Sequence, residues 1–270
     1  MPIAYTDTGP APHTRDASAI LFGHGLMFGG WMFSPQIATL RHRYRCLTID
    51  WRGQGETPAT RSGYDMDTLT TDAVGLIRRL NVAPVHYVGL SMGGFVGLRL
   101  AARHGELLRS LTLLNTSADE EDPGDARRYR MLASAYQILG PRPLSNQILS
   151  RLFGPAHRAR PEHQAVRDEW IGRLRRLRRG GVRKAVRGVA DRASVCPELF
   201  RIATPTFVAA GEDDVATPVA KSRRIAAAIS GARFEQISRC GHTSTLEQPR
   251  AVTGIIERFL SELTGTSCLN

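Results

Sequence analysis

Lysine, cysteine and long apolar runs are all scarce in this chain of 270 residues. Only Lys184 and Lys221 are lysines, so arginine supplies 34 of the 36 basic side chains. The four cysteines lack the paired spacing of a zinc site or a disulfide framework, and we expect neither a metal nor a cofactor. No apolar run is long enough to span a bilayer, and residues 1–16 do not resemble a signal peptide. The sequence therefore predicts a cytoplasmic protein without a membrane span.

The positive charge is concentrated in one part of the chain. The 36 basic and 25 acidic residues give a net charge of +11, which allows an anionic macromolecule as partner. Residues 124–195 hold 17 basic and 5 acidic side chains, whereas the rest of the chain has a net charge of −1. No nucleic-acid-binding motif accompanies the charge, so we expect no nucleic-acid partner. Within residues 172–180, the spacing of Leu174 and Leu177 predicts leucines facing inward and arginines facing water.

Short apolar runs rich in β-branched residues alternate with helical patterns in the first 115 residues and again after residue 205. This alternation predicts an α/β protein with a mostly parallel central sheet and helices on both faces. The expected strands are Ala19–Phe22, Cys46–Ile49, Val85–Gly89, Leu111–Leu114, Thr206–Ala209 and Phe234–Ile237. The expected helices are Ser34–Leu40, Met66–Leu80, Met92–Arg103, Pro218–Ile229 and Pro249–Leu263.

Between these two parts the strand signal disappears. Residues 118–195 show only helical periodicity, which prolines divide into short helices. We therefore predict a core made of residues 1–117 and 196–270, with residues 118–195 inserted as a helical lid over the strand ends. Its inner face is expected to carry Met131, Leu132, Tyr136, Ile138, Leu139, Trp170, Ile171 and Leu174.

The strongest motif is Gly-Leu-Ser-Met-Gly-Gly at residues 89–94, which fits the pattern G-x-S-x-G. It follows an apolar strand and opens a helical pattern, so it predicts a sharp strand-to-helix turn. Such a turn projects the Ser91 hydroxyl above the sheet and directs the Met92 amide at a developing oxyanion. The pattern indicates a nucleophilic serine.

A serine nucleophile needs a general base, and the base needs an acid to orient it. An acidic loop with Asp213 and Asp214 follows the expected strand at residues 206–209, and His242 follows the last expected strand. Both positions lie at the carboxyl ends of strands, in the order nucleophile, acid, histidine. On these residues alone, either aspartate is a candidate for the acid.

Five segments in this order resemble the α/β-hydrolase-fold serine hydrolases. They are His24-Gly25, Asp50-Trp51-Arg52-Gly53-Gln54-Gly55, the turn at residues 89–94, the acid loop at residues 211–218, and Gly241-His242 with Glu247-Gln248-Pro249. The resemblance covers nearly the whole chain and is greatest to carboxylesterases and enol-lactonases. Its acid-loop pattern G-x-x-D-x-x-T-P points to Asp214, with Asp213 as the alternative.

The resemblance implies a role for each site residue. Ser91 would attack a carbonyl carbon, His242 would transfer the proton, and Asp214 would orient the imidazole. The backbone amides of Leu26 and Met92 would form the oxyanion hole. His24, Asp50 and Arg52 are expected to be structural. The substrate pocket is expected to include Met27, Phe28, Trp31, Tyr136 and Trp170, with Trp51 nearby.

These roles predict hydrolysis of a carboxylic ester or lactone of a small hydrophobic or aromatic substrate through an acyl-enzyme. Alternatives that keep the fold are an acyl thioesterase acting on a substrate held by an acidic carrier protein, a C–C bond hydrolase and a cofactor-free perhydrolase. In the first of these, the arginine-rich lid would be the docking face. A ligand sensor without catalysis is a further alternative, against which the complete set of three residues argues.

Overall fold

A computed structural model describes residues 3–11 and 18–265 of the chain, and Cys268 lies outside these ranges. The described residues form one sheet of seven strands in the order β1-β3-β2-β4-β5-β6-β7. Only β1 is antiparallel to its neighbour. The strands are β1 (Tyr5–Asp7), β2 (Ala19–Gly23), β3 (Arg45–Ile49), β4 (Val85–Leu90), β5 (Leu108–Leu114), β6 (Thr206–Gly211) and β7 (Arg233–Ile237). The predicted fold class is confirmed.

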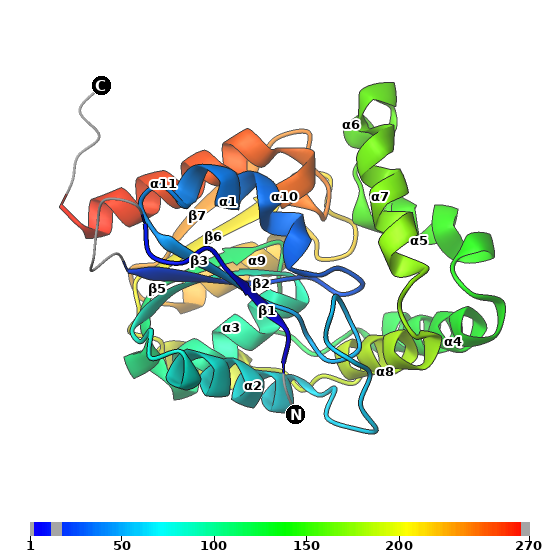
Figure 1. The fold of residues 1–270 in the computed structure, drawn as a ribbon, viewed down its shortest axis with the longest axis horizontal. Helices are drawn as coiled ribbons and strands as arrows, with labels where there is room; N and C mark the ends of the chain where they lie inside the picture. Colours follow the sequence, from blue (N-terminus) through cyan, green and yellow to red (C-terminus); the bar gives the residue numbers. More distant parts are fainter. Residues whose placement is uncertain (1–2, 12–17, 266–270) are drawn as a thin grey trace.

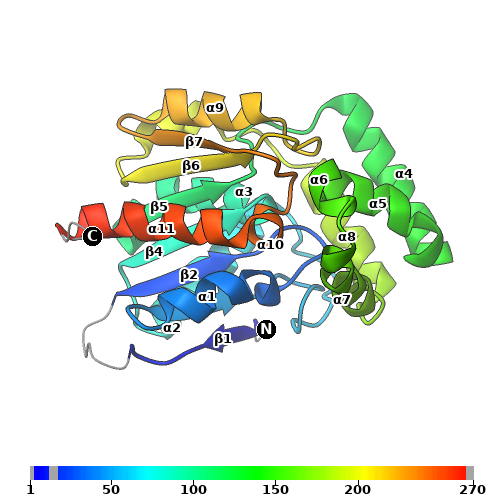
Figure 2. The ribbon, with the colours of Figure 1, turned by 90° about the horizontal axis from the view of Figure 1, so that it is seen from above.

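Helices cover both faces of the sheet (Figures 1 and 2). One face carries α1 (Ser34–Leu40) and α11 (Pro249–Leu263), and the other carries α2 (Met66–Arg79), α3 (Met92–Arg103) and α9 (Val219–Ala228). The short α10 (Ser244–Glu247) precedes α11. Every residue of β2, β4 and β6 is buried, as expected for central parallel strands that are covered on both faces.

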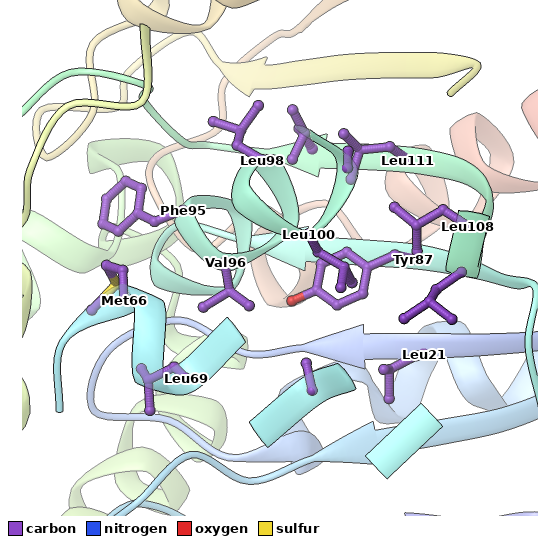
Figure 3. Close-up of a cluster of buried hydrophobic side chains, with 14 of the residues drawn as sticks. Leu21, Met66, Leu69, Tyr87, Phe95, Val96, Leu98, Leu100, Leu108 and Leu111 are labelled. Carbon is purple, nitrogen blue, oxygen red and sulfur yellow. The ribbon is translucent and has the colours of Figure 1, made fainter. Parts of the chain in front are cut away.

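Two hydrophobic clusters hold these layers together, one on each face. The first lies beneath α2 and α3, and Figure 3 shows part of it, with Tyr87 of β4 among leucines of the sheet and of α3. The second lies beneath α1 and α11 and continues into the helices after β5. The continuation joins those helices to the sheet body through apolar contacts.

Residues 118–195 lie between β5 and β6 and contain no strand, and we call them the inserted segment. It forms α4 (Pro123–Leu139), α5 (Ser145–Leu152), α6 (Pro155–Arg158), α7 (Gln164–Leu174) and α8 (Arg179–Ala190). These helices gather at one end of the sheet in both views (Figures 1 and 2). No helix in the described residues has the length and apolar character needed to cross a membrane.

The inner face predicted for the inserted segment is partly wrong. Met131, Ile138 and Leu139 are 65%, 76% and 58% exposed, so they face solvent. Tyr136, Trp170 and Leu174 are buried, and Leu132 and Ile171 are half-buried. Met131 to Leu139 span two turns of one long helix, and only one side of a helix can face the body.

The arginine-rich stretch between α7 and α8 is a turn. Helix α7 ends at Leu174, and α8 begins at Arg179. Leu174 is buried and Leu177 is half-buried, whereas Arg175, Arg176 and Arg178 are exposed. The prediction of inward leucines and outward arginines is therefore confirmed.

Candidate active site

Ser91 occupies a strained turn between β4 and α3. Its φ of 52° and ψ of −112° lie outside the regions that ordinary residues prefer. Hydrogen bonds hold this conformation: the Ser91 N–H donates to the Leu114 carbonyl at 2.9 Å, and the Ser91 carbonyl accepts from Thr116 Oγ1 at 2.9 Å. The side chain therefore sits at the carboxyl end of β4, where the sequence motif predicts it.

Glycine is required on either side of Ser91 because the backbones approach so closely. A Cβ at Gly89 would lie 2.5 Å from the carbonyl oxygen of Gly93. A Cβ at Gly93 would lie against the carbonyl oxygen of Gly23, far inside van der Waals contact. The two motif glycines thus allow the turn to fold tightly between β2 and β4.

Tyr87 braces the turn from inside the sheet, a role that the sequence analysis did not anticipate. Its ring is buried, and its hydroxyl donates to the Gly93 carbonyl at 2.8 Å. Burial raises the pKa of Tyr87, so the hydroxyl keeps its proton and remains a donor. A polar residue at the centre of an apolar strand was the available sequence signal.

His242 and Asp214 form a buried pair at the ends of β7 and β6. His242 Nδ1 lies 3.0 Å from Asp214 Oδ1 and 2.9 Å from Oδ2. Asp213 is half-buried, and its backbone N–H donates to the Cys240 carbonyl at 2.8 Å. The structure thus places Asp214, and not Asp213, against the histidine.

Four further hydrogen bonds orient the Asp214 carboxylate. Oδ1 accepts from the N–H groups of Ala216 and Thr217, and Oδ2 accepts from the Thr217 hydroxyl and from Asn115 Nδ2 at 2.9 Å. Asn115 also donates to the Gly241 carbonyl at 3.0 Å, next to His242. Asn115 is not among the predicted site residues, and its position directly after β5 was the available sequence signal for this role.

The pair also controls the protonation of both partners. Burial alone would raise the pKa of Asp214, but the His242 charge and the hydrogen bonds bring it below its ordinary value. Burial alone would lower the pKa of His242, but the Asp214 charge and hydrogen bond raise it. With Nδ1–H donating to Asp214, the neutral imidazole has its lone pair at Nε2, which can accept a proton.

The loop after β2 brings a backbone amide to the same region. Within the described residues the Leu26 N–H has no protein acceptor, and Met92 is the first residue of α3, whose N–H has no partner inside the helix. Met27, at φ 65°, is held by Gln54, whose buried Oε1 accepts its N–H at 2.7 Å. Gln54 lies in the motif at residues 50–55, and no role was predicted for it.

His24, Asp50 and Arg52 make hydrogen bonds to other parts of the protein. Burial lowers the pKa of His24, and its Nε2 accepts the Trp51 N–H at 3.0 Å. Asp50 accepts the Gly30 N–H at 2.7 Å, and Arg52 pairs with Asp72 through two hydrogen bonds. These contacts shape the loops beside Ser91 without reaching it.

Ser91 and His242 line one cavity of about 120 Å³ beneath the inserted segment. Within the described residues no hydrogen bond joins their side chains. The rest of the lining is mainly apolar and comes mostly from the loop after β2 and from α4, α5 and α8, with single residues from β4, from α3 and from the turn before α5. It includes Leu26, Met27, Phe28, Leu90, Phe95, Leu132, Ala133, Tyr136, Leu144, Ile148, Leu152, Val186 and Val189.

Of the predicted pocket residues, Met27, Phe28 and Tyr136 line this cavity, whereas Trp31 and Trp170 do not. Trp170 is fully buried behind it and donates its indole N–H to the Met27 carbonyl at 3.2 Å. Trp31 packs its ring beneath the Arg173 guanidinium, 4.9 Å from it. Trp170 therefore supports the loop that lines the cavity, and the Trp31 ring also packs against Phe28 of that loop, with 5.7 Å between ring centroids. Trp51 is likewise buried and donates to the His24 carbonyl.

A buried carboxylate joins the histidine loop to the inserted segment. Glu247 Oε2 accepts the N–H groups of Gly154 and Gly241, and Oε1 accepts that of Thr243 at 3.0 Å. Thr243 also donates its own hydroxyl to the Leu152 carbonyl at 2.7 Å. Gly241 and Thr243 flank His242, so one side chain ties the backbone on both sides of the imidazole to the end of α5.

Comparison with known proteins identifies the family. The profile of the alpha/beta hydrolase fold matches residues 18–249. The chain belongs to this family.

Individual members of the family match over almost the whole chain at modest identity. A protein of Mycobacterium tuberculosis named as a non-heme bromoperoxidase, BpoC, is 28% identical over 97% of this chain and 98% of its own. The 3-oxoadipate enol-lactonase 2 of Acinetobacter baylyi is 28% identical over 91% of this chain and 89% of its own. The crystal structure of the enol-lactonase from Burkholderia xenovorans LB400 superimposes with a TM-score of 0.87, at 28% identity and 96% coverage of both chains. These relatives support hydrolase activity.

Proposed function

We propose that the protein is a serine hydrolase that cleaves a carboxylic ester or lactone of a small hydrophobic or aromatic substrate. The observation that carries the proposal is that Ser91 and the Asp214-bound His242 line one apolar cavity. Residues 118–195 act in this proposal as a lid, since α4, α5 and α8 supply much of that lining.

In the first step, Ser91 Oγ attacks the carbonyl carbon while His242 Nε2 takes the hydroxyl proton. The carbonyl oxygen becomes an oxyanion that accepts hydrogen bonds from the Leu26 and Met92 amides. When this intermediate collapses, His242 returns the proton to the leaving alkoxide. In a lactone, the alcohol so formed remains attached to the acyl chain.

In the second step, water attacks the acyl-enzyme. His242 takes a proton from the water, the oxyanion forms again at the same amides, and collapse releases the acid and restores Ser91. Throughout, the Asp214 carboxylate holds the Nδ1–H and stabilises the imidazolium. The four hydrogen bonds that orient Asp214 keep the imidazole at one angle to the cavity.

The test is hydrolysis of p-nitrophenyl acyl esters of increasing chain length and of small lactones. Ser91→Ala is expected to reduce kcat by about 10⁶-fold, because the covalent step is lost. Ser134→Ala makes the same chemical change on the exposed side of α4 and is expected to keep the activity. Absence of ester and lactone turnover in the parent protein, or undiminished turnover in folded Ser91→Ala, would refute the proposal.

The relative named as a bromoperoxidase gives one reason for a second candidate, transfer of the acyl group to hydrogen peroxide instead of water. The acyl-enzyme would be the same, and peroxide attack would release a peracid. Turnover with acetate or an acetate ester and hydrogen peroxide, followed by a peracid-dependent halide oxidation assay, tests this. Peracid formed only when Ser91 is present would favour the second candidate, and its absence leaves water as the acceptor.

A further inference from the structure

The cavity next to Ser91 is lined by apolar residues and by a group of polar side chains, here called the polar wall, that the proposed reaction does not use. Tyr136 uses its hydroxyl to donate to the Leu174 carbonyl. Besides this residue and Ser91, Thr217 and His242, the polar side chains in the lining are Glu121, Tyr129, Gln147 and Arg151. All four belong to the inserted segment, whereas the reacting groups come from the ends of strands. The cavity therefore offers hydrogen bonding to a part of the substrate away from the reacting carbonyl.

Arg151 on α5 is part-buried but has few acceptors for its guanidinium group. Its Nε is buried and has no hydrogen-bond partner within the described residues. Its ion pair with Asp125 is long, 3.5 Å from Nη2 to Oδ1, and the same oxygen accepts from Arg128 at 2.6 Å. A buried N–H without an acceptor is unfavourable. The Arg151 side chain as a whole is 23% exposed and lines the cavity, where an acceptor on a ligand would add a hydrogen bond to the guanidinium.

Glu121, the carboxylate in the cavity lining, is not free to accept a hydrogen bond from Arg151. Glu121 is already paired with Arg192 at 2.9 Å and with Lys221 at 3.8 Å. Each of the two carboxylates near this wall, Asp125 and Glu121, is thus shared by two cations. Of the two charged residues in the lining, Glu121 has a close ion pair of its own, whereas Arg151 has only the long one with Asp125, which favours an anion beside Arg151.

The aromatic neighbour of Arg151 adds a donor. The Arg151 guanidinium lies over the Tyr129 ring, 5.5 Å from its centroid. This stacking restrains the plane of the guanidinium, whose N–H groups form a planar fork of donors. Burial, together with the carboxylates of Glu121 and Asp125, raises the pKa of Tyr129, so its hydroxyl remains protonated. A planar fork beside a hydroxyl matches the two oxygens of a carboxylate.

We propose that Arg151 binds a free carboxylate on the substrate, so that the protein acts on an ester or lactone that carries a second, anionic end. This inference rests on the proposed function, since it concerns the substrate of the same site. The apolar lining between Arg151 and Ser91 would then contact the carbon chain that separates the two carbonyl carbons.

The test compares esters that differ only at the far end of the acyl group. Mono-p-nitrophenyl esters of linear dicarboxylic acids are paired with p-nitrophenyl esters of monocarboxylic acids of equal length, over several lengths. The parent protein is expected to prefer the dicarboxylic ester at one length. Arg151→Met is expected to lower kcat/KM for that ester about 10- to 100-fold more than for its neutral partner, since a charge-assisted hydrogen bond is lost.

Two further variants separate recognition from folding. Arg151→Lys keeps the charge but not the fork and is expected to recover part of the preference. Arg127→Met removes an exposed arginine from α4 and is expected to change neither ester. The proposal is overturned if the parent protein shows no preference at any length, or if Arg151→Met lowers both esters equally.

The outcomes also distinguish this inference from the proposed function. Neutral esters hydrolysed in a Ser91-dependent way without a dicarboxylate preference would refute the anion site alone. Absence of Ser91-dependent turnover of either ester would refute the serine hydrolase and the anion site together.

Discussion

Asp214 accepts hydrogen bonds from two backbone amides and two side chains besides its contact with His242. So many donors favour the ionised carboxylate strongly enough to overcome burial. The resulting negative charge is the principal favourable influence on the protonated form of His242. The pH dependence of the proposed reaction should therefore reflect this pair, and its macroscopic pKa values belong to both residues.

We expect kcat/KM to fall on the acid side as His242 becomes protonated, at a pH above the ordinary imidazole pKa, because Asp214 raises the pKa of His242. Asp214→Asn removes that charge, so the acid limb should move to lower pH and kcat should fall about 10⁴-fold. Profiles of kcat/KM between pH 5 and 9 check both effects.

Asp213→Asn is the matched control, because Asp213 is adjacent in sequence but, among the described residues, Asp214 and not Asp213 forms the ion pair with His242. Its profile should overlay that of the parent protein. If Asp213→Asn shifts the acid limb and Asp214→Asn does not, the acid has been assigned to the wrong residue.

At the scale of elements, the loop between β7 and α10 is held to the end of α5 by Glu247. This carboxylate accepts three backbone N–H groups from two segments about ninety residues apart in sequence. Leu152 adds two acceptor contacts to Thr243. Because Gly241 and Thr243 flank His242, the position of the imidazole and the position of the inserted segment are coupled.

Glu247→Gln should destabilise the protein by about 1–3 kcal/mol, because an amide nitrogen cannot accept and leaves a buried N–H unpaired. It should also lower kcat more than it raises KM, since the imidazole loses its fixed position. Urea unfolding and steady-state kinetics measure the two effects.

Glu120→Gln makes the same change at an exposed position and should leave both quantities unchanged. Wild-type stability and kcat in Glu247→Gln would show that the three N–H groups find other acceptors.

Over the whole molecule, some arginines are exposed to solvent and others are buried in ion pairs. Arg175, Arg176 and Arg178 are exposed in the turn between α7 and α8, and a role for them in docking an acidic carrier protein stays a prediction. Arg192 is buried instead. It pairs with Glu121 at 2.9 Å and lies over the Phe95 ring, so it joins the inserted segment to α3.

Arg192→Met should reduce the free energy of unfolding by about 3–5 kcal/mol, because it leaves the Glu121 carboxylate buried with only a distant Lys221. Urea or thermal unfolding measures this loss. Arg187→Met removes an exposed arginine from the end of α8 and should change stability by less than about 0.5 kcal/mol. Equal stabilities of the two variants would show that Glu121 is neutralised in another way.

Much of the fold could be predicted from the chain because its causes are local. The bounds of α1, α3 and α11 match the predicted ranges. Helices α1 and α11 have a proline in their first turn, and α3 follows the strand-to-helix turn at Ser91, so each start has a local signal in the sequence. The prediction for β5 starts three residues too late, because the exposed Arg109 interrupts the apolar run that the prediction relies on. Such boundaries depend on pairing with neighbours and are less well determined by sequence.

The sequence by itself determined which chemical groups meet, because carboxyl ends of parallel strands share one edge of a sheet. Ser91 and His242 follow β4 and β7, and the acid must follow β6, whichever aspartate it is. Steric demands at Gly89 and Gly93 are likewise local and were readable as a motif.

Only the tertiary structure decided which groups hold the site in place. The contact of Asp214 with His242, the support of Met27 by Gln54 and the three bonds to Glu247 each join segments distant in sequence. Their partners are chosen by distance and angle, which no periodicity encodes. The same reason explains Met131 and Trp170: an apolar side chain predicts burial, but packing between helices decides which side of each helix meets the body and which residues reach the cavity.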